Sequence, residues 1–280
     1  MKTLQSSDVR EALRQALLRM NVVLPEDVRR ALRDAAARET GPARAVLQRI
    51  LDNVEIAERR CLPMCQDTGM VVTFVELGQD VRVEGEGLPA LIDGAIADAY
   101  QDGYFRKSVV VDPLKDRKNT GTNLPAVVYW DVVTGDGLVI SCLAKGFGSE
   151  NYSRAYMLKP TEGRGAVIGA VVKAMREAGG NPCPPVILGV GIGGTMDWAA
   201  RLSKQALLRE LDDQHPDPYY AALERDILET VNGTGIGAGG LGGLTTALGV
   251  KIATYPTHIA GLPVAVSVNC WADRRAVVRF

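Results

Sequence analysis

The chain has 280 residues, 46% of them hydrophobic, and its 32 basic and 33 acidic residues leave a formal net charge of -1. This length allows one large domain with a sizeable core, and the balanced charge gives no reason to expect a nucleic acid or an anionic membrane surface as a partner. The sequence shows neither a signal-peptide core nor an apolar run of membrane-spanning length, so we expect a cytoplasmic protein.

The first sixty residues are predicted to form helices. Apolar residues recur at helical spacing from Val9 to Met20 and from Val28 to Ala35. The chain then breaks at Gly41-Pro42, before a third helix of about residues 43 to 59.

Strands and helices alternate after residue 61. The predicted strands are Val71–Leu77, Val81–Val83, Ala126–Val133, Leu138–Ala144, Val186–Val190, Lys251–Tyr255 and Val264–Val268. The predicted helices are Leu88–Tyr100, Gly165–Ala178, Met196–Leu211 and Pro218–Val231. Two of the strands flank Gly135-Asp136-Gly137 and are predicted to form a hairpin. The pattern indicates a mixed α/β fold of one domain, residues 1–280, in which a helical segment (1–60) packs on a mixed-sheet core (61–280).

Five cysteines are an odd number, and a reducing compartment disfavours disulfides. Cys142 lies inside an apolar strand, which favours simple burial. Cys65, Cys183 and Cys270 each stand where an element ends beside Pro, Gly or Asn. For each of these three cysteines, burial in the core is the alternative to metal binding. No C-x-x-C pair is present, so three dispersed thiols suit an iron–sulfur cluster with one open iron better than a zinc finger.

Two glycine runs allow more than one interpretation. The run from Gly189 to Gly194 fits G-x-G-x-x-G between a strand and a helix, as in dinucleotide-binding proteins, but the strand expected after that helix is missing. A backbone nest for an anion, a cluster or a carboxylate is the alternative. The run from Gly233 to Gly240 lacks the Lys-Ser/Thr ending of a phosphate loop, so close backbone packing and close approach of a ligand both fit it.

Three polar residues are further candidates. His258 lies in a loop between two strands, twelve residues before Cys270, where it could relay protons for an acid such as Asp67 or serve only a structural role. Arg106 follows a predicted helix and could bind a carboxylate or be an ordinary surface cation.

Together these residues resemble the iron–sulfur hydro-lyases of the class I fumarase and L-tartrate dehydratase family, and more narrowly the α subunit of the two-subunit enzymes. The resemblance covers nearly the whole chain. It is carried by Cys65-Gln66-Asp67-Thr68-Gly69, Arg106-Lys107-Ser108, residues 145 to 151, Asn181-Pro182-Cys183-Pro184-Pro185 with the glycine run after it, and residues 258 to 270.

The resemblance implies a role for each matching position. The metal ligands would be Cys65, Cys183 and Cys270, which would hold a [4Fe-4S] cluster whose fourth iron binds substrate. Substrate would be held by Gln66, Arg106 and the backbone at Gly148. Asp67 and His258 would form the pair that transfers protons.

The resemblance also implies an oxygen-sensitive hydro-lyase that acts on a small dicarboxylate. Fumarate hydratase, an enzyme of the tricarboxylic acid cycle, is the first expectation and tartrate dehydratase the nearest rival. Single-chain relatives continue into a second domain, so we expect a separate β subunit and an α2β2-type assembly. A nucleotide-binding oxidoreductase that uses Gly189 to Gly194, or a non-catalytic cluster protein, would be an alternative from another class.

Overall fold

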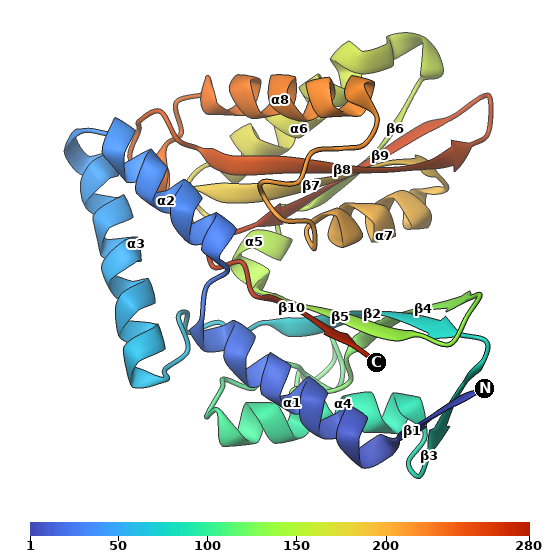
Figure 1. Cartoon of the computed structure of the whole chain (residues 1–280). Helices are drawn as coiled ribbons and strands as arrows, with labels where there is room; N and C mark the ends of the chain where they lie inside the picture. Colours follow the sequence, from blue (N-terminus) through green and yellow to red (C-terminus); the bar gives the residue numbers. More distant parts are fainter. The chain divides into compact units, whose positions relative to one another are not determined.

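The computed structural model describes residues 1–280 and divides the chain into two compact units. Unit 1 comprises residues 1–24, 54–147 and 274–280, and unit 2 comprises residues 25–53 and 148–273. Each unit has its own four-stranded mixed sheet with helices packed on it, which confirms the mixed α/β fold class (Figure 1). No helix of the chain is both long and apolar enough to cross a membrane.

Unit 1 is built on a sheet with the strand order β10-β5-β2-β4. Its elements are β1 (Lys2–Gln5), α1 (Ser6–Val22), β2 (Met70–Gly78), β3 (Val81–Glu84), α4 (Leu88–Asp102), β4 (Val127–Val133), β5 (Leu138–Lys145) and β10 (Arg275–Arg279). Helices α1 and α4 pack against each other, and Val9, Leu13 and Leu17 of α1 are fully buried in the core of this unit. Their spacing of four residues places all three on one face of the helix.

Unit 2 is built on a sheet with the strand order β6-β9-β7-β8. Its elements are α2 (Glu26–Arg38), β6 (Arg154–Leu158), α6 (Gly163–Ala178), β7 (Val186–Gly194), α7 (Met196–Ala206), α8 (Pro218–Asn232), β8 (Ala247–Thr257) and β9 (Leu262–Asn269), with the short 3-10 turns η1 (Pro160–Glu162) and η2 (Ala238–Gly240). Within this unit, α6 and α8 lie on one face of the sheet and α7 lies on the other (Figure 1). Two further helices, α3 (Gly41–Arg60) and α5 (Phe147–Glu150), each contain residues of both units.

The predicted hairpin of β4 and β5 is wrong. Strand β2 lies between them, parallel to β4 and antiparallel to β5. The Gly135-Asp136-Gly137 segment instead joins strands two positions apart, and backbone N–H groups of Gly78 and Asp80 donate to the carbonyls of Gly137 and Gly135. A local turn signal cannot reveal a strand that is inserted from an earlier part of the chain.

Strand β7 accounts for the first glycine run. The strand extends to Gly194, so these glycines lie in a buried strand and not in a loop after it. A Cβ on Gly189 would lie 2.0 Å from the carbonyl oxygen of Ser203, and one on Gly191 would lie 2.0 Å from that of Ala199. The glycines therefore allow α7 to pack directly on the sheet, which removes the main argument for a dinucleotide loop.

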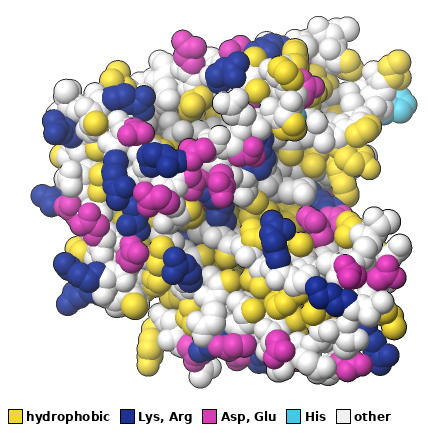
Figure 2. Space-filling view, in the orientation of Figure 1, with side chains coloured by type: hydrophobic (Ala, Val, Ile, Leu, Met, Phe, Trp, Pro, Cys, Tyr) yellow, Lys and Arg dark blue, Asp and Glu magenta, His cyan; other side chains and the backbone are white.

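Charged side chains of both signs are interspersed over the visible face of the molecule (Figure 2). This distribution agrees with the net charge of -1.

Candidate active site

In unit 1, the loop from Cys65 to Gly69 is tied to its surroundings by buried polar groups. The Tyr100 hydroxyl donates to the carbonyls of Thr68 (2.7 Å) and Gly69 (3.0 Å), and the Thr68 hydroxyl donates to the carbonyl of Arg106 (2.8 Å). Gly69 has a φ of +79°, and a Cβ there would lie 2.7 Å from the Lys145 backbone. Glycine is thus required where the loop enters β2.

The Asp67 carboxylate is held in a defined orientation. Its Oδ2 accepts the N–H of Phe147 (2.8 Å) and its Oδ1 accepts the N–H of Gly69 (3.0 Å). The guanidinium of Arg274 donates to the Asp67 carbonyl oxygen. A carboxylate whose two oxygens are directed by backbone donors is preorganised for proton transfer at a fixed position.

Sequence reasoning missed three buried polar residues around this loop: Tyr100, Lys145 and Arg274. Arg274 and Lys145 are each only 1% exposed, and charged residues are rarely so buried without partners. Burial raises the pKa of the Tyr100 hydroxyl above its usual value, so this side chain stays a neutral donor. Lys145 is the first residue of the segment 145 to 151, which is part of the family resemblance. No sequence pattern around Tyr100 or Arg274 indicates a role in the site.

The two predicted substrate-binding side chains of unit 1 are exposed. Arg106 makes no hydrogen bond or ion pair through its guanidinium within this unit, while its carbonyl is fixed by Thr68. Gln66 is exposed beside Cys65, whose Sγ lies 3.6 Å from the Gln66 Oε1. The Arg106 guanidinium can therefore bind a ligand without breaking a contact within the unit, whereas the Gln66 Oε1 already accepts from the Cys65 thiol.

In unit 2, Cys183 and Cys270 lie at the same end of the sheet. Cys183 stands three residues before β7 and Cys270 directly follows β9, and Ile187 of β7 pairs with Asn269 of β9. The Cys183 loop is supported by the second glycine run: the Gly239 N–H donates to the Pro184 carbonyl (2.8 Å).

Backbone packing also explains this second glycine run. A Cβ on Gly240 would lie 2.5 Å from the Cα of Gly180, which precedes the Cys183 loop. Gly240 has a φ of +74°, so glycine is favoured by both conformation and space. The run thus shapes the loop that carries a predicted ligand.

His258 lies at the other end of the same sheet. It follows β8 directly, next to the pairing of Gly193 with Tyr255, in a cavity of about 430 Å³ that also contains Trp198. Gly148, the remaining predicted substrate-binding position, is exposed in α5, and a Cβ there would meet no atom within 4 Å. The sheet therefore has Cys183 and Cys270 at one end and His258 at the other.

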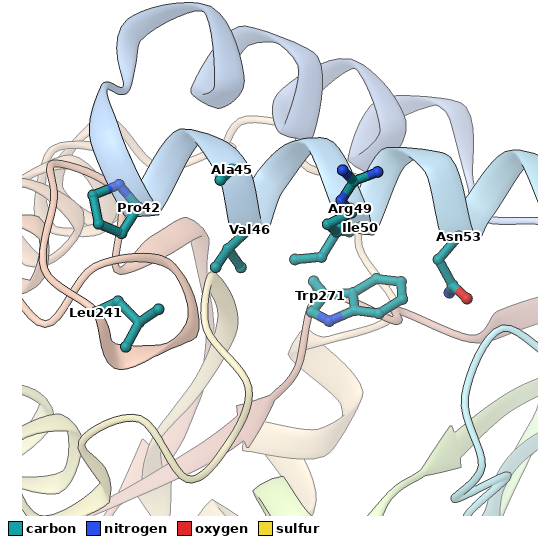
Figure 3. Close-up of a pocket in the computed structure, with 8 residues that line it drawn as sticks. All are labelled: Pro42, Ala45, Val46, Arg49, Ile50, Asn53, Leu241 and Trp271. Atoms are coloured by element: carbon teal, nitrogen blue, oxygen red, sulfur yellow. The ribbon is translucent and has the colours of Figure 1, made fainter.

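A second cavity of about 430 Å³ lies along α3 (Figure 3). Its lining is largely apolar and includes Val46, Ile50, Leu241 and Trp271, the residue after Cys270. No predicted site residue lines it, and we assign it no chemical role.

The structure separates the five cysteines by exposure. None forms a disulfide; Cys142 is completely buried, and Cys61, Cys65, Cys183 and Cys270 are at least partly accessible. Burial raises the pKa of the Cys142 thiol to about 12, so it stays protonated and unsuited to bind metal. Within either unit, no three His, Cys, Asp or Glu side chains are grouped as a metal site.

Comparison with known proteins places the chain in a family. The family model of fumarate hydratase (Fumerase) matches residues 10–279. A Methanocaldococcus jannaschii protein, provisionally named L(+)-tartrate dehydratase subunit alpha, is 39% identical over 265 residues, or 92% of this chain and 93% of the relative. L(+)-tartrate dehydratase subunit alpha from Escherichia coli strain UTI89 is 35% identical over 260 residues, 91% of this chain and 85% of the relative. The chain therefore belongs to the fumarate hydratase (Fumerase) family.

Proposed function

We propose that this chain is the α subunit of a two-subunit hydro-lyase that dehydrates L-tartrate. The observation that carries the hydro-lyase proposal is the fixed Asp67 carboxylate, two residues from an accessible thiol, in a chain of the fumarate hydratase family. The choice of tartrate over fumarate rests on the names of the relatives, which cover more than nine tenths of this chain. Fumarate hydratase, the first expectation from the sequence, becomes the second candidate.

The donor set fits an iron–sulfur cluster. Cys65, Cys183 and Cys270 are accessible and not in disulfides, and thiolates are the usual ligands of such clusters. When bound, a [4Fe-4S] cluster with one open iron would supply a Lewis acid at the substrate hydroxyl. We therefore assign these three thiols as the proposed ligands and exclude Cys142.

The chain's own residues then have distinct proposed roles. Arg106 binds a substrate carboxylate through its unpaired guanidinium, and Gln66 offers an amide to a neighbouring oxygen. Asp67 removes the proton from the carbon next to the one that loses hydroxyl, because its orientation is fixed before substrate arrives. His258 is the proposed proton-transfer partner of Asp67.

The proposal is tested by anaerobic purification of the chain with its β subunit, followed by assays with L-tartrate, malate and fumarate. We expect a brown complex that releases water fastest from L-tartrate, and at least 100-fold less turnover from the chain alone. Preferred turnover of malate or fumarate would replace tartrate by the second candidate. A colourless complex that binds NAD would contradict the hydro-lyase proposal as a whole.

A further inference from the structure

Two segments of unit 1 that lie outside its helices and strands carry the proposed substrate chemistry of that unit. One is the loop from Cys65 to Gly69, which holds the proposed base Asp67. The other is residues 106 to 122, here called the arginine arm, which begins with the proposed carboxylate-binding residue Arg106. A base and a cation that act on one small substrate need a fixed spacing, and an error of about 1 Å is costly. Something other than regular secondary structure must therefore hold the arm and the loop together.

The first link between them comes from Thr68, the residue after Asp67. Its hydroxyl donates to the Arg106 carbonyl (2.8 Å), and the residue is only 1% exposed. A buried hydrogen bond of this kind is shielded from competition with water. The link therefore fixes the backbone of Arg106 beside the residue that follows the base.

The second link is made by the side-chain amide of Asn123, the residue directly after the arm. Its Oδ1 accepts the Ser108 N–H (2.8 Å), and its Nδ2 donates to the Gly69 carbonyl (3.0 Å). Because an N–H can only donate and a carbonyl can only accept, the amide fits in this one orientation. Asn123 is 1% exposed, so both of its hydrogen bonds lie in the interior of the unit. One side chain thus spans the arm and the loop.

We propose that Asn123 is a positioning residue, which together with Thr68 sets the place of the Arg106 guanidinium relative to the Asp67 carboxylate. The inference rests on the function proposed above for these two charged groups. The two links hold the arm at Arg106 and two residues after it, and they hold the loop at the two residues after Asp67. The guanidinium has no ion pair within the unit, so its backbone determines where it can meet a substrate carboxylate.

The backbone of Asn123 allows a clean removal of its amide. Its φ is +66°, in the left-handed region, which glycine adopts without strain. In Asn123→Gly the Gly69 carbonyl keeps the Tyr100 hydroxyl (3.0 Å), and Asp67 keeps its two N–H donors. The substitution therefore frees the arm and leaves the loop with the base in place.

The direct test is the steady-state kinetics of L-tartrate dehydration by the anaerobic complex with the β subunit. We expect Asn123→Gly to lower kcat/KM about tenfold, mainly through a higher KM, because the hold on the substrate carboxylate is loosened while the base is not. Loss of folded protein alone would instead lower kcat and leave KM unchanged. In a chain that already carries Arg106→Ala, Asn123→Gly should lower kcat/KM by less than about twofold, because no guanidinium remains to be positioned.

Asn119 provides the matched control within the same arm. Its Nδ2 donates to the Lys107 carbonyl (2.7 Å) and its Oδ1 accepts the Gly121 N–H (2.7 Å), so both partners lie in the arm itself. Asn119→Ala removes the same kind of hydrogen bonds without touching a link to the loop. It should change KM by less than about twofold.

A second variant tests the proposal should Asn123→Gly fold poorly. Thr68→Val keeps the shape of the side chain but removes the donor to the Arg106 carbonyl. It should also raise KM, and this effect should again disappear in the Arg106→Ala chain.

Hydrogen exchange gives a readout that does not depend on activity. Residues 106–111 should exchange about tenfold faster in Asn123→Gly than in the wild type, while β5 exchanges at the wild-type rate. Exchange of residues 106–111 at the wild-type rate would overturn the proposal. So would an effect of Asn123→Gly on kcat/KM that stays about tenfold in the Arg106→Ala chain. A wild-type complex without turnover of L-tartrate, malate or fumarate would contradict the proposed function, while the exchange comparison would still decide whether Asn123 holds the arm.

Discussion

Asp67 combines a fixed carboxylate with a position two residues from a proposed cluster ligand. Its two oxygens accept N–H groups from Gly69 and Phe147, and the Arg274 guanidinium holds its backbone. These contacts orient the acid without neutralising it by a direct side-chain ion pair. The arrangement supports a role in moving a substrate proton.

The first prediction concerns this carboxylate. Asp67→Asn keeps the size of the side chain and an oxygen that can accept one N–H, but it removes the base. We expect kcat to fall by about 10²–10⁴, the usual contribution of a general base, with unchanged iron content. Steady-state kinetics and iron analysis of the complex with the β subunit test this. A kcat within twofold of wild type would remove Asp67 from the mechanism.

Cys142 leads to a prediction about pH. Its pKa is raised to about 12 by burial, whereas a thiol in the unfolded chain titrates near about 8.5. The folded chain then holds this proton more tightly, so the stability that the buried neutral thiol contributes is fully present below about pH 8.5 and is lost as pH rises toward 12.

The measurement is urea unfolding of the reduced chain without iron at pH 7, 8.5 and 10, for the wild type and Cys142→Ala. We expect the wild type to lose more unfolding free energy than the variant between pH 8.5 and 10. Parallel pH curves for the two proteins would show that Cys142 titrates normally and is not buried as described.

The glycines of β7 allow a close contact between this strand and α7. Because a Cβ at Gly191 would lie 2.0 Å from the Ala199 carbonyl oxygen, Gly191→Ala must push α7 away from the strand. We expect a loss of about 1–3 kcal/mol of unfolding free energy, typical of overpacking. Chemical denaturation measures it.

A matched control for this prediction lies in α6. Gly169 is exposed, and a Cβ there would meet nothing within 4 Å. Gly169→Ala should stabilise the protein by up to about 1 kcal/mol through helix propensity. Equal stability of the Gly191→Ala variant and the wild type would contradict the packing account and restore the dinucleotide-loop interpretation of the glycine run.

The sequence predicts the elements better than their pairing. Helical periodicity places α1, α2 and α4 correctly, because the buried stripe of each helix is local. Three short strands, β1, β6 and β10, were not predicted; each has four or five residues and no fully buried position, so the hydrophobic signal of each is weak. The insertion of β2 between β4 and β5 depends on contacts between residues far apart in the chain, which no local pattern contains.

At the scale of the whole molecule, one part of the candidate site could be predicted from the sequence and another part could not. The motif from Cys65 to Gly69 could be identified from sequence because its residues are consecutive. The support from Tyr100 and Arg274 could not, since both reach the loop from distant segments. The position of His258 at the far end of the sheet could not be predicted either. His258 precedes Cys270 by only twelve residues, and the strand pairing is needed to show that the two lie at opposite ends of the sheet.

The thiol assignment is the central claim, and iron analysis tests it most directly. Iron and acid-labile sulfide are measured in anaerobic complexes with the β subunit that carry Cys65→Ser, Cys183→Ser, Cys270→Ser or the control Cys142→Ala. We predict that each of the three serine variants loses the cluster and that Cys142→Ala retains it in full. Full iron content in any of the three serine variants, or its loss in Cys142→Ala, would contradict the account.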